Sequence, residues 1–513
     1  MSKFNRPWAI GIIIFGIAIL AFIAGMLIMS FGVGISTDSV CYIDGARSIL
    51  ARLSFSCYGH IVTRYPPGYS LLLAINSLFR SDPLITARWL HAYMYGLNSA
   101  LVGLLVYLST NKSGPAAIIA QLLFLLSPSM LILHTMAWSE PADILLLLLA
   151  FLFFILYTQK PVIWWLLLTS FLAGLIIITR YAGISVVPAI ILAILLLKYK
   201  PFKERLKDCL IFLVIAVFPL GIWMVRNKLS ANAFTDRALV FHPIARSQII
   251  SFFSTFVKFL LTQNASRFSL NLIIFVITSS LILLGIFIST KASLKDKHPN
   301  SVNIIIQHLL IIYILTYLLV LFFSITFFDA SITLDERILS PVFVIGLILI
   351  FSVIYKVSNI SGKPVVWKAC ILVFLVFIYI NALPFRRAAS DIQKNGEGFA
   401  SLSWQQSASI RYLKSLPKEI LIYTNAPDVA YILTGKYASS LPNVDNRVTT
   451  VLNPTFISEM DKLKNDLSQK DTYVLFFNNL HRDNIPTRND LVNKYHFPVL
   501  LELADGTVFG IGQ

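Results

Sequence analysis

Two stretches near the N-terminus, TDSVCYIDGARSIL at 37–50 and TRYPPGYSLLLAINSLF at 63–79, decide the fold class of this chain. The first places an acidic residue, Asp38, just after an apolar run, and the second joins a Tyr-Pro-Pro turn to a short apolar segment. A helix over Pro67–Phe79 would be roughly 20 Å long, whereas the hydrocarbon core of a bilayer is about 30 Å thick. We therefore expect a helix that lies in the membrane interface with a carboxylate beside it.

Composition places the chain among integral membrane proteins. Hydrophobic residues make up 57% of its 513 residues, charged residues make up 13%, and the mean hydropathy is +0.76. A soluble globular domain does not reach these values. Apolar segments long enough to cross a bilayer predict eleven transmembrane helices. They are 8–31, 86–109, 115–134, 139–157, 162–179, 182–198, 208–225, 269–290, 304–327, 337–355 and 365–384.

The basic residues predict how these helices are oriented. Lys and Arg in short loops stay on the cytoplasmic side, and KYKPFKERLKD at 198–208 lies between the sixth and seventh predicted helices. With a cytoplasmic N-terminus, the alternation puts Asp38 and Glu140 outside and sends everything beyond residue 385 outside. We predict a multi-pass plasma-membrane protein whose C-terminal part is extracytoplasmic. The net charge of +17 follows mostly from this topology, and no RNA-binding motif indicates nucleic acid as a partner.

After residue 385 the sequence changes character. Charged residues become common and apolar runs shrink to strand length, which is typical of a soluble α/β domain. The chain would then have a transmembrane domain at 1–385, with a first outer loop at 32–80 that carries interfacial helices, and a soluble domain at 386–513. The predicted elements of the soluble domain are strands at 419–425 and 472–477, a helix at 428–435 that ends at Gly435, and a hairpin at 500–511 that turns on Asp505 and Gly506.

Several landmarks follow one another along the transmembrane part. They are Asp38-Ser39 leading to Tyr42 and Ala46, the turn Pro66-Pro67-Gly68-Tyr69, WSEPADILLLLLAF from Trp138, TRYAGISVVP from Thr179, FPLGIWMVRN from Phe218 and LDERILSPVF from Leu334. In this order, they resemble the GT-C membrane glycosyltransferases, which include protein O-mannosyltransferases, lipid A aminoarabinose transferases and related bacterial enzymes that use polyprenyl-phosphate sugars. The resemblance covers roughly residues 8–385. It implies an all-α polytopic domain of GT-C type.

The resemblance implies a hexosyl or pentosyl transferase that moves a sugar from a polyprenyl-phosphate donor to an extracytoplasmic lipid, glycan or protein acceptor, with inversion. The lipid phosphate leaves without needing a proton, so one general base that takes the proton of the acceptor hydroxyl is sufficient. A glycoside hydrolase needs a second carboxyl group as an acid. Asp38 is the candidate base. Alternatively, or in addition, Asp38 caps the interfacial helix.

Four further side chains are candidates for binding the acceptor or the sugar: Glu140, Asp143, Tyr42 and Tyr65. Glu140 opens the fourth helix at its outer end, where the resemblance implies an acidic residue that faces the first loop. Alternatively, this Ser-Glu-Pro sequence is simply a favourable helix start. Asp143 lies one turn deeper and can replace Glu140, since an acidic side chain at that depth should face the protein interior.

The departing phosphate needs positive charge, and basic residues on the outer side oppose the topological trend. Arginine matches phosphate oxygens in a bidentate way that lysine cannot. For each arginine, the alternative is a side chain that anchors a helix end by snorkelling. The candidates are Arg64, Arg180, Arg226 and Arg337. In the outer loop at 226–268, SQIISFFSTFVKFLL predicts an amphipathic helix on the outer surface, beside the lipid carrier.

Metal and disulfide signals are sparse. No His/Cys cluster has the spacing of a zinc site. Asp329, Asp335 and Glu336 are close enough in sequence to hold a divalent cation, but the resemblance implies that neither a metal nor a cofactor is needed. Cys41 and Cys57 both fall in the first outer loop and either pair in an oxidising compartment or stay reduced.

The main alternative function is transport, because a transporter or flippase of a polyprenyl-linked glycolipid would also be polytopic. Such a protein should show internal repeats and helices interrupted near the bilayer midplane, and the sequence indicates neither. A membrane scaffold that presents its outer domain is a third alternative. It leaves the ordered acidic and arginine landmarks unexplained.

Overall fold

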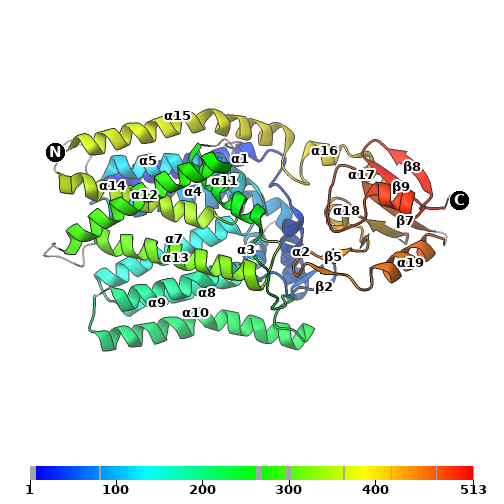
Figure 1. Ribbon diagram of the computed structural model, residues 1–513, viewed down its shortest axis with the longest axis horizontal. Helices are drawn as coiled ribbons and strands as arrows, with labels where there is room; N and C mark the ends of the chain where they lie inside the picture. Colours follow the sequence, from blue (N-terminus) through cyan, green and yellow to red (C-terminus); the bar gives the residue numbers. More distant parts are fainter. Residues whose placement is uncertain are drawn as a thin grey trace.

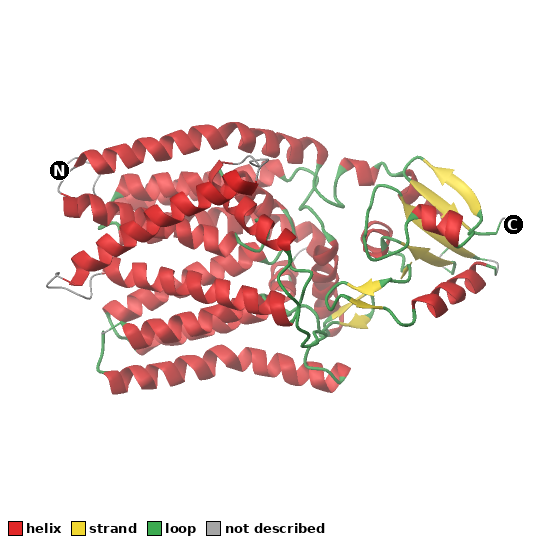
Figure 2. Ribbon diagram, viewed as in Figure 1, coloured by secondary structure: helices red, strands yellow, loops and turns green. Residues whose placement is uncertain are grey.

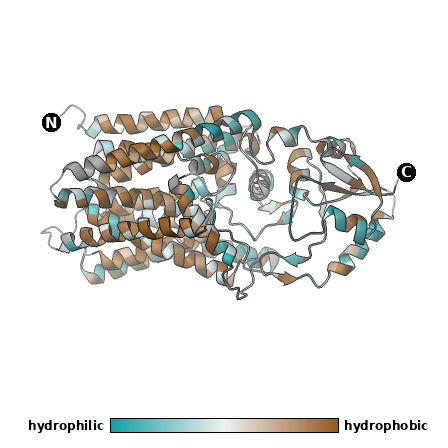
Figure 3. Cartoon of the chain, turned by 45° about the horizontal axis from the view of Figure 1, so that its top comes forward, coloured by the Kyte–Doolittle hydropathy of each residue, from teal (hydrophilic) through white to brown (hydrophobic). Residues whose placement is uncertain are grey.

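The structure is a computed structural model of the 513-residue chain. It describes residues 7–79, 82–197, 199–261, 268–294, 302–361, 364–417, 419–468 and 471–511. A bundle of long helices forms one end of the molecule, and a small domain that contains a sheet forms the other (Figure 1, Figure 2). Hydrophobic residues dominate the bundle, whereas the small domain is mixed (Figure 3). This confirms the predicted class, a helical membrane domain followed by a small α/β domain.

Eight helices among the described residues are long and apolar enough to cross a membrane. Shorter apolar helices complete the bundle, so that all eleven predicted segments are helical. The eight long helices are α1 (Pro7–Ile28), α4 (Pro83–Ser109), α7 (Glu140–Gln159), α10 (Phe202–Ala231), α12 (Phe268–Leu294), α13 (Val302–Phe327), α14 (Ser340–Ser361) and α15 (Pro364–Asn395).

The predicted helix at 115–134 is interrupted, although the sequence analysis indicated no interrupted helix. It consists of α5 (Gly114–Leu125) and α6 (Pro128–Thr135), which are bent by 62°. Proline disfavours helical geometry in the residue before it. The preceding Ser127 starts the second helix instead, because its hydroxyl accepts a hydrogen bond from the N–H of Met130.

Two other predicted spans correspond to shorter apolar helices. α8 (Ile163–Thr179) has 17 residues and α9 (Val186–Leu196) has 11, and the 3-10 helix η2 (Tyr181–Ser185) joins them. On length and composition, the described residues contain eight helices long enough to span, or up to nine with the bent pair, and the remaining predicted spans correspond to the shorter α8 and α9. Apolar composition identifies each hydrophobic segment but does not indicate where its helix breaks.

Two spanning helices extend beyond their predicted apolar limits. α10 continues past both ends of the predicted range 208–225. α15 continues through Pro384 and ends at Asn395, beyond the predicted domain boundary at 385. The Arg-Arg-Ala-Ala sequence that follows Phe385 favours helix, so the helix outlasts the apolar stretch. The predicted boundary at 385 therefore falls within α15.

The segment between α1 and α4 lies at the end of the bundle nearest the soluble domain (Figure 1). It contains α2 (Thr37–Arg52), a hairpin of β1 (Ser56–Cys57) and β2 (His60–Ile61), and α3 (Gly68–Ser77). With 10 residues, α3 confirms the predicted short helix. Glycine is needed at its start, because a Cβ on Gly68 would lie 2.6 Å from the carbonyl oxygen of Ile178.

The soluble domain is built on a five-stranded sheet in the order β4-β3-β7-β9-β8. β3 (Leu421–Thr424) pairs in parallel with β4 (Ser439–Ser440) and β7 (Thr472–Phe477). β9 (Gly506–Phe509) runs antiparallel to β7 and to β8 (Val499–Leu503). Both predicted strands and the predicted hairpin are therefore confirmed, with the hairpin turn formed by residues 504–505.

Helices cover this sheet, and one of them faces the bundle. α18 (Pro427–Thr434) packs against α2 and ends at Gly435, which has a φ of +71°. The predicted helix closed by Gly435 is therefore confirmed. The other elements are α16 (Leu402–Gln405), α17 (Ala408–Ser415), α19 (Phe456–Leu467), the π-helix η3 (Asp490–Lys494), and a small ladder of β5 (Asp445–Asn446) and β6 (Val451–Leu452).

The predicted amphipathic helix is α11 (Arg246–Leu261). Its Phe253 and Phe256 pack against Phe275 of α12, with ring centroids 4.9 and 4.8 Å apart. Part of its apolar face is therefore covered by the bundle.

Cysteine labelling should reveal the orientation of the bundle. A cysteine introduced at Ser439, which is exposed in β4, should react with a membrane-impermeant maleimide on intact cells, whereas one at Ser113, between α4 and α5, should not. The free thiols of Cys209 and Cys370 are first replaced by Ser. Labelling at residue 113 but not at residue 439 would show that the topology is the reverse of the predicted one, with Asp38 on the cytoplasmic side.

Candidate active site

Asp38 lies in the first turn of α2. The helix starts at Thr37 because Ser36 is its N-cap, and the Ser36 N–H donates to the Ser39 hydroxyl at 3.0 Å in a capping box. Since Ser36 forms the cap, the Asp38 carboxylate stays available for other partners. Its place near the positive end of the helix dipole favours the ionised form.

Two donors hold the Asp38 carboxylate. The Tyr65 hydroxyl donates to Oδ1 and the Arg337 guanidinium donates to Oδ2, both at 2.7 Å. Burial opposes ionisation, but Arg337 and Tyr65 outweigh it and hold the pKa of Asp38 below its usual value. The side chain is still 28% exposed. Asp38 is therefore an ionised carboxylate that a substrate can reach.

A cluster of ion pairs lies beside Asp38. The Nε of Arg337 donates to Glu140 while its Nη1 holds Asp38, and Arg180 pairs with the same Glu140 carboxylate. The Trp138 ring lies against Arg337, with the guanidinium carbon 4.8 Å from the ring centroid. Glu140 is buried, and a buried carboxylate needs such partners. Two arginines thus neutralise two carboxylates.

Two buried carboxylate oxygens at the start of α7, Glu140 Oε2 and Asp143 Oδ1, make no hydrogen bond with any described residue. Buried polar atoms are normally paired, so such a group of acceptors is uncommon. Asp143 is also close enough to Arg180 to interact with it electrostatically.

Tyrosine rings connect α2 to the Tyr-Pro-Pro turn. Tyr42 lies one turn after Asp38 and contacts Tyr65 and Tyr69 edge-on, with centroids 5.3 and 5.1 Å apart. Burial raises the pKa of Tyr42 to about 12, with a smaller contribution from Asp38, so its phenol stays neutral. Of the two predicted tyrosines, Tyr65 contacts Asp38 directly and Tyr42 supports Tyr65.

Arg64 has an exposed side chain next to this cluster. Its guanidinium carbon lies 5.8 Å from the Tyr65 ring centroid, and it forms no ion pair with a residue that the structure describes. Nearby protein atoms partly exclude water from the guanidinium and oppose its charge, but Tyr65, Asp236 and Asp38 outweigh this and raise the pKa of Arg64. Arg64 is therefore a cation with free donors near Asp38.

Arg226 occupies a different environment from the other predicted arginines. Its guanidinium donates to the carbonyl oxygens of Val62 and Phe55, both at 2.8 Å, and lies over the Trp223 ring. These bonds tie α10 to the β1–β2 hairpin. The structure thus places Arg226 at the hairpin and not in the Asp38 cluster.

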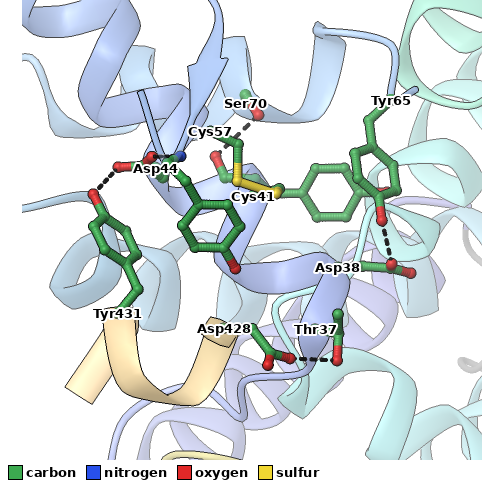
Figure 4. Close-up of a disulfide and its surroundings, with 11 residues drawn as sticks. Thr37, Asp38, Cys41, Asp44, Cys57, Tyr65, Ser70, Asp428 and Tyr431 are labelled. Carbon is green, nitrogen blue, oxygen red and sulfur yellow. Dashed lines mark hydrogen bonds between the residues drawn. A yellow bond between two sulfur atoms is a disulfide. The ribbon is translucent and has the colours of Figure 1, made fainter. Parts of the chain in front are cut away.

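A disulfide fixes α2 to β1. Cys41 and Cys57 are bonded, with their Cα atoms 5.1 Å apart (Figure 4), so of the two alternatives that the sequence left open the paired one is present. Cys41 follows Asp38 by three residues, so the bond anchors the helix close to the carboxylate.

The residues of the soluble domain that contact α2 are not among the predicted site residues. Thr37 donates to Asp428 at 2.7 Å, and Tyr431 donates to Asp44 at 2.5 Å (Figure 4). The partners are 391 and 387 residues apart. No local spacing signals such contacts, although an acidic residue beside the candidate base, Asp44, could have been singled out.

The three acidic residues considered for a cation have other partners. Asp329 pairs with Arg237 at 3.2 Å, Glu336 pairs with Lys258 at 2.9 Å, and Asp335 accepts bonds from its own turn. The described residues contain no group of three or more side chains that could hold a metal ion.

Known proteins resemble this chain in part of its sequence and throughout its fold. The sequence model of the family described as dolichyl-phosphate-mannose-protein mannosyltransferase matches residues 64–223. The crystal structure of ArnT from Cupriavidus metallidurans bound to undecaprenyl phosphate matches with a TM-score of 0.58 and 12% identity, over 100% of both chains. The apo state of ArnT from the same organism also gives 0.58 and 12%, over 98% of this chain and 99% of that chain. No curated protein sequence matches this chain.

These matches confirm the predicted resemblance to the GT-C membrane glycosyltransferases. The chain is a multi-pass membrane protein with an ArnT-like GT-C fold. The family match includes Tyr65, Glu140 and Arg180 but begins after Asp38.

Proposed function

We propose that the chain transfers a sugar from a polyprenyl-phosphate donor to a hydroxyl group of an extracytoplasmic acceptor, with inversion. The observation that carries the proposal is the partly exposed, ionised Asp38, held by Tyr65 and Arg337. The fold match to a protein bound to undecaprenyl phosphate supports a lipid-phosphate donor. The acceptor would be a lipid, a glycan or a protein.

In the proposed reaction, Asp38 takes the proton of the acceptor hydroxyl while the acceptor oxygen attacks the anomeric carbon. The bond between the anomeric carbon and the phosphate oxygen breaks, and its electron pair leaves with the phosphate as polyprenyl phosphate. A single displacement from the opposite face inverts the anomeric centre. A lowered pKa makes Asp38 a weak base, but it ensures that the group is ionised at neutral pH, and the phosphate needs no acid to leave.

Two of the predicted arginines can bind the phosphate, and the other two make structural contacts within the protein. Arg64 is the best candidate for the lipid phosphate because its donors are not used by described residues. Arg337 lies at the same site and can share a phosphate oxygen while it holds Asp38. We assign Arg180 to the support of Glu140, and Arg226 to the anchoring of the hairpin.

The acidic residues of α7 suit a sugar or acceptor better than a cation. Glu140 Oε2 and Asp143 Oδ1 are buried acceptors that can receive hydrogen bonds from hydroxyl groups. Tyr42 would contribute a neutral ring beside them. We propose neither a metal nor a cofactor, because the lipid-linked sugar is a substrate and its leaving group is already activated.

Replacing Arg64 with Lys should raise the KM for the donor by about tenfold, because Lys keeps the charge but loses the bidentate contact with phosphate. The measurement is a titration of polyprenyl-phosphate sugar with purified protein. Arg47→Lys is the matched control, since Arg47 makes a bidentate pair with Asp82 away from the cluster. Unchanged donor kinetics in Arg64→Lys would remove Arg64 from the phosphate site.

A cleavage assay tests the proposed function itself. Purified protein in liposomes receives polyprenyl phosphate that carries a labelled hexose or pentose, together with membranes from cells that lack the gene. A transferase releases free polyprenyl phosphate and labels an acceptor. A transporter moves the intact glycolipid, and the interrupted α5–α6 pair is the feature that favours this alternative. Movement without cleavage would reject the proposal.

A further inference from the structure

We propose that the soluble domain positions the catalytic helix, with Asp428 and Tyr431 of α18 as positioning residues for Asp38. The inference rests on the proposed role of Asp38. It assigns to the soluble domain a part in the active site, although none of its residues touches the Asp38 carboxylate in the contacts described above.

The first contact fixes the start of α2. Thr37, which directly precedes Asp38, donates to Oδ2 of Asp428 at 2.7 Å, and Arg482 donates to Oδ1 at 2.6 Å. Asp428 is only 2% exposed. Because its carboxylate is buried and held by an arginine, it is a rigid acceptor for Thr37.

The second contact lies two turns further along the same face of α2. Asp44 accepts from the Tyr431 hydroxyl at 2.5 Å (Figure 4). It also accepts from the Tyr58 N–H at 2.9 Å, and the rings of Tyr58 and Tyr431 pack edge-on with centroids 5.0 Å apart. Residues 37 and 44 are seven apart, or about two helical turns. Two contacts at this spacing fix both the rotation and the tilt of the helix.

The membrane domain holds α2 from other directions. The Trp138 indole donates to the Ser36 hydroxyl at 2.8 Å, and the Cys41–Cys57 bond ties the helix to β1. Asp38 projects between these supports toward Tyr65 and Arg337. A small rotation of α2 would therefore lengthen both hydrogen bonds of Asp38 and move it away from the acceptor hydroxyl.

The α18 contact is not required to attach the soluble domain. The Phe399 N–H donates to the Ile35 carbonyl at 2.8 Å, and the Ala330 N–H donates to the Val448 carbonyl at 3.1 Å. His242 also bonds to the Thr449 carbonyl. Loss of one side-chain contact from α18 should therefore leave the domain in place.

The test compares Tyr431→Phe and Thr37→Val with matched variants in the full-length protein. Each should lower kcat by about tenfold, because misplacement of a reacting group by about 1 Å is costly, while the KM for the donor stays near its wild-type value. Thr37→Ser keeps the hydroxyl and should retain activity. Tyr423→Phe removes a similar bond, from Tyr423 to Asp466 at 2.7 Å, within the soluble domain, and should have no effect.

The pH profile separates positioning from a general loss of folded protein. Arg337 and Tyr65, with Arg64 nearby, hold the pKa of Asp38 down against burial. If α2 moves, this stabilisation weakens, and the acid limb of the kcat profile should shift to higher pH in Tyr431→Phe. A smaller folded fraction would lower kcat equally at every pH and leave the limb unchanged.

Two results would overturn the inference: wild-type kcat in both Tyr431→Phe and Thr37→Val, or lowered kcat with an unmoved acid limb. The double variant adds a further check, because two residues that act through the same helix position should show less than additive losses. An active Asp38→Asn protein would instead reject the proposed function, so the two failures are distinguishable.

Discussion

Asp38→Asn should abolish sugar transfer and leave the protein folded. Asn keeps the size of the side chain but cannot accept a proton, and loss of a general base costs about 10²- to 10⁴-fold in rate. The helix start is not at risk, because Ser36 is the N-cap of α2. Arg337 also keeps a partner, since it donates to Glu140 as well. The measurement is turnover of labelled polyprenyl-phosphate sugar by purified, monodisperse protein.

Asp466→Asn is the matched control for this substitution. Asp466 accepts from Tyr423 at 2.7 Å, as Asp38 accepts from Tyr65 at 2.7 Å, but it lies in the soluble domain. The same chemical change there should leave turnover unaltered. Wild-type turnover by Asp38→Asn would show that Asp38 is not the base, and the cluster would then be structural.

Local sequence features predicted much of the fold. The short helix after the Tyr-Pro-Pro turn, the strand TYVLFF, the hairpin at residues 499–509 and the helix ended by Gly435 are all present. Each depends on residues close in sequence, such as a glycine that permits positive φ or a short run of apolar residues bounded by turn residues. The sequence left the pairing of Cys41 with Cys57 open, because it does not fix how the chain turns between the end of α2 and β1.

The helix break at Ser127-Pro128 and the length of α15 were predicted incorrectly for a common reason. Hydropathy averages over a window, so a Ser-Pro step inside an apolar run leaves the average high although the helix bends by 62°. Conversely, the polar end of α15 falls outside the apolar window although it continues the helix to Asn395. The hydropathy of a segment and the positions where its helix bends or ends are therefore different properties.

The partners within the site depend on contacts between distant parts of the chain. Arg337 lies 299 residues after Asp38, and Thr37 bonds to a residue of the soluble domain. Arg226 and Arg337 carry the same charge and are predicted on the same side of the membrane, so the sequence alone does not distinguish their roles. Tertiary packing separates them, because Arg226 meets backbone carbonyls and Arg337 meets two carboxylates.

Arg337→Lys should reduce transfer by about 10²-fold. A lysine keeps the charge, but its single ammonium group cannot hold Asp38 and Glu140 in the fixed geometry of a guanidinium, and misplacement of a catalytic group can cost about that much. The loss should appear mainly in kcat, because Arg337 orients the base. Thermal unfolding and transfer are measured on the same preparation.

Arg337→Met should lower the free energy of unfolding of the protein. It leaves Asp38 without its arginine and buried Glu140 with Arg180 alone, and removal of one partner from a buried ion pair costs about 3–5 kcal/mol. Arg47→Met is the control, since Arg47 and Asp82 are 31% and 38% exposed and such surface pairs contribute about 0–1 kcal/mol.

If Arg337→Lys kept wild-type kcat, the two-carboxylate arrangement would not matter for transfer. Asp38 would then have to be held in its reactive position by Tyr65 and the fixed start of α2.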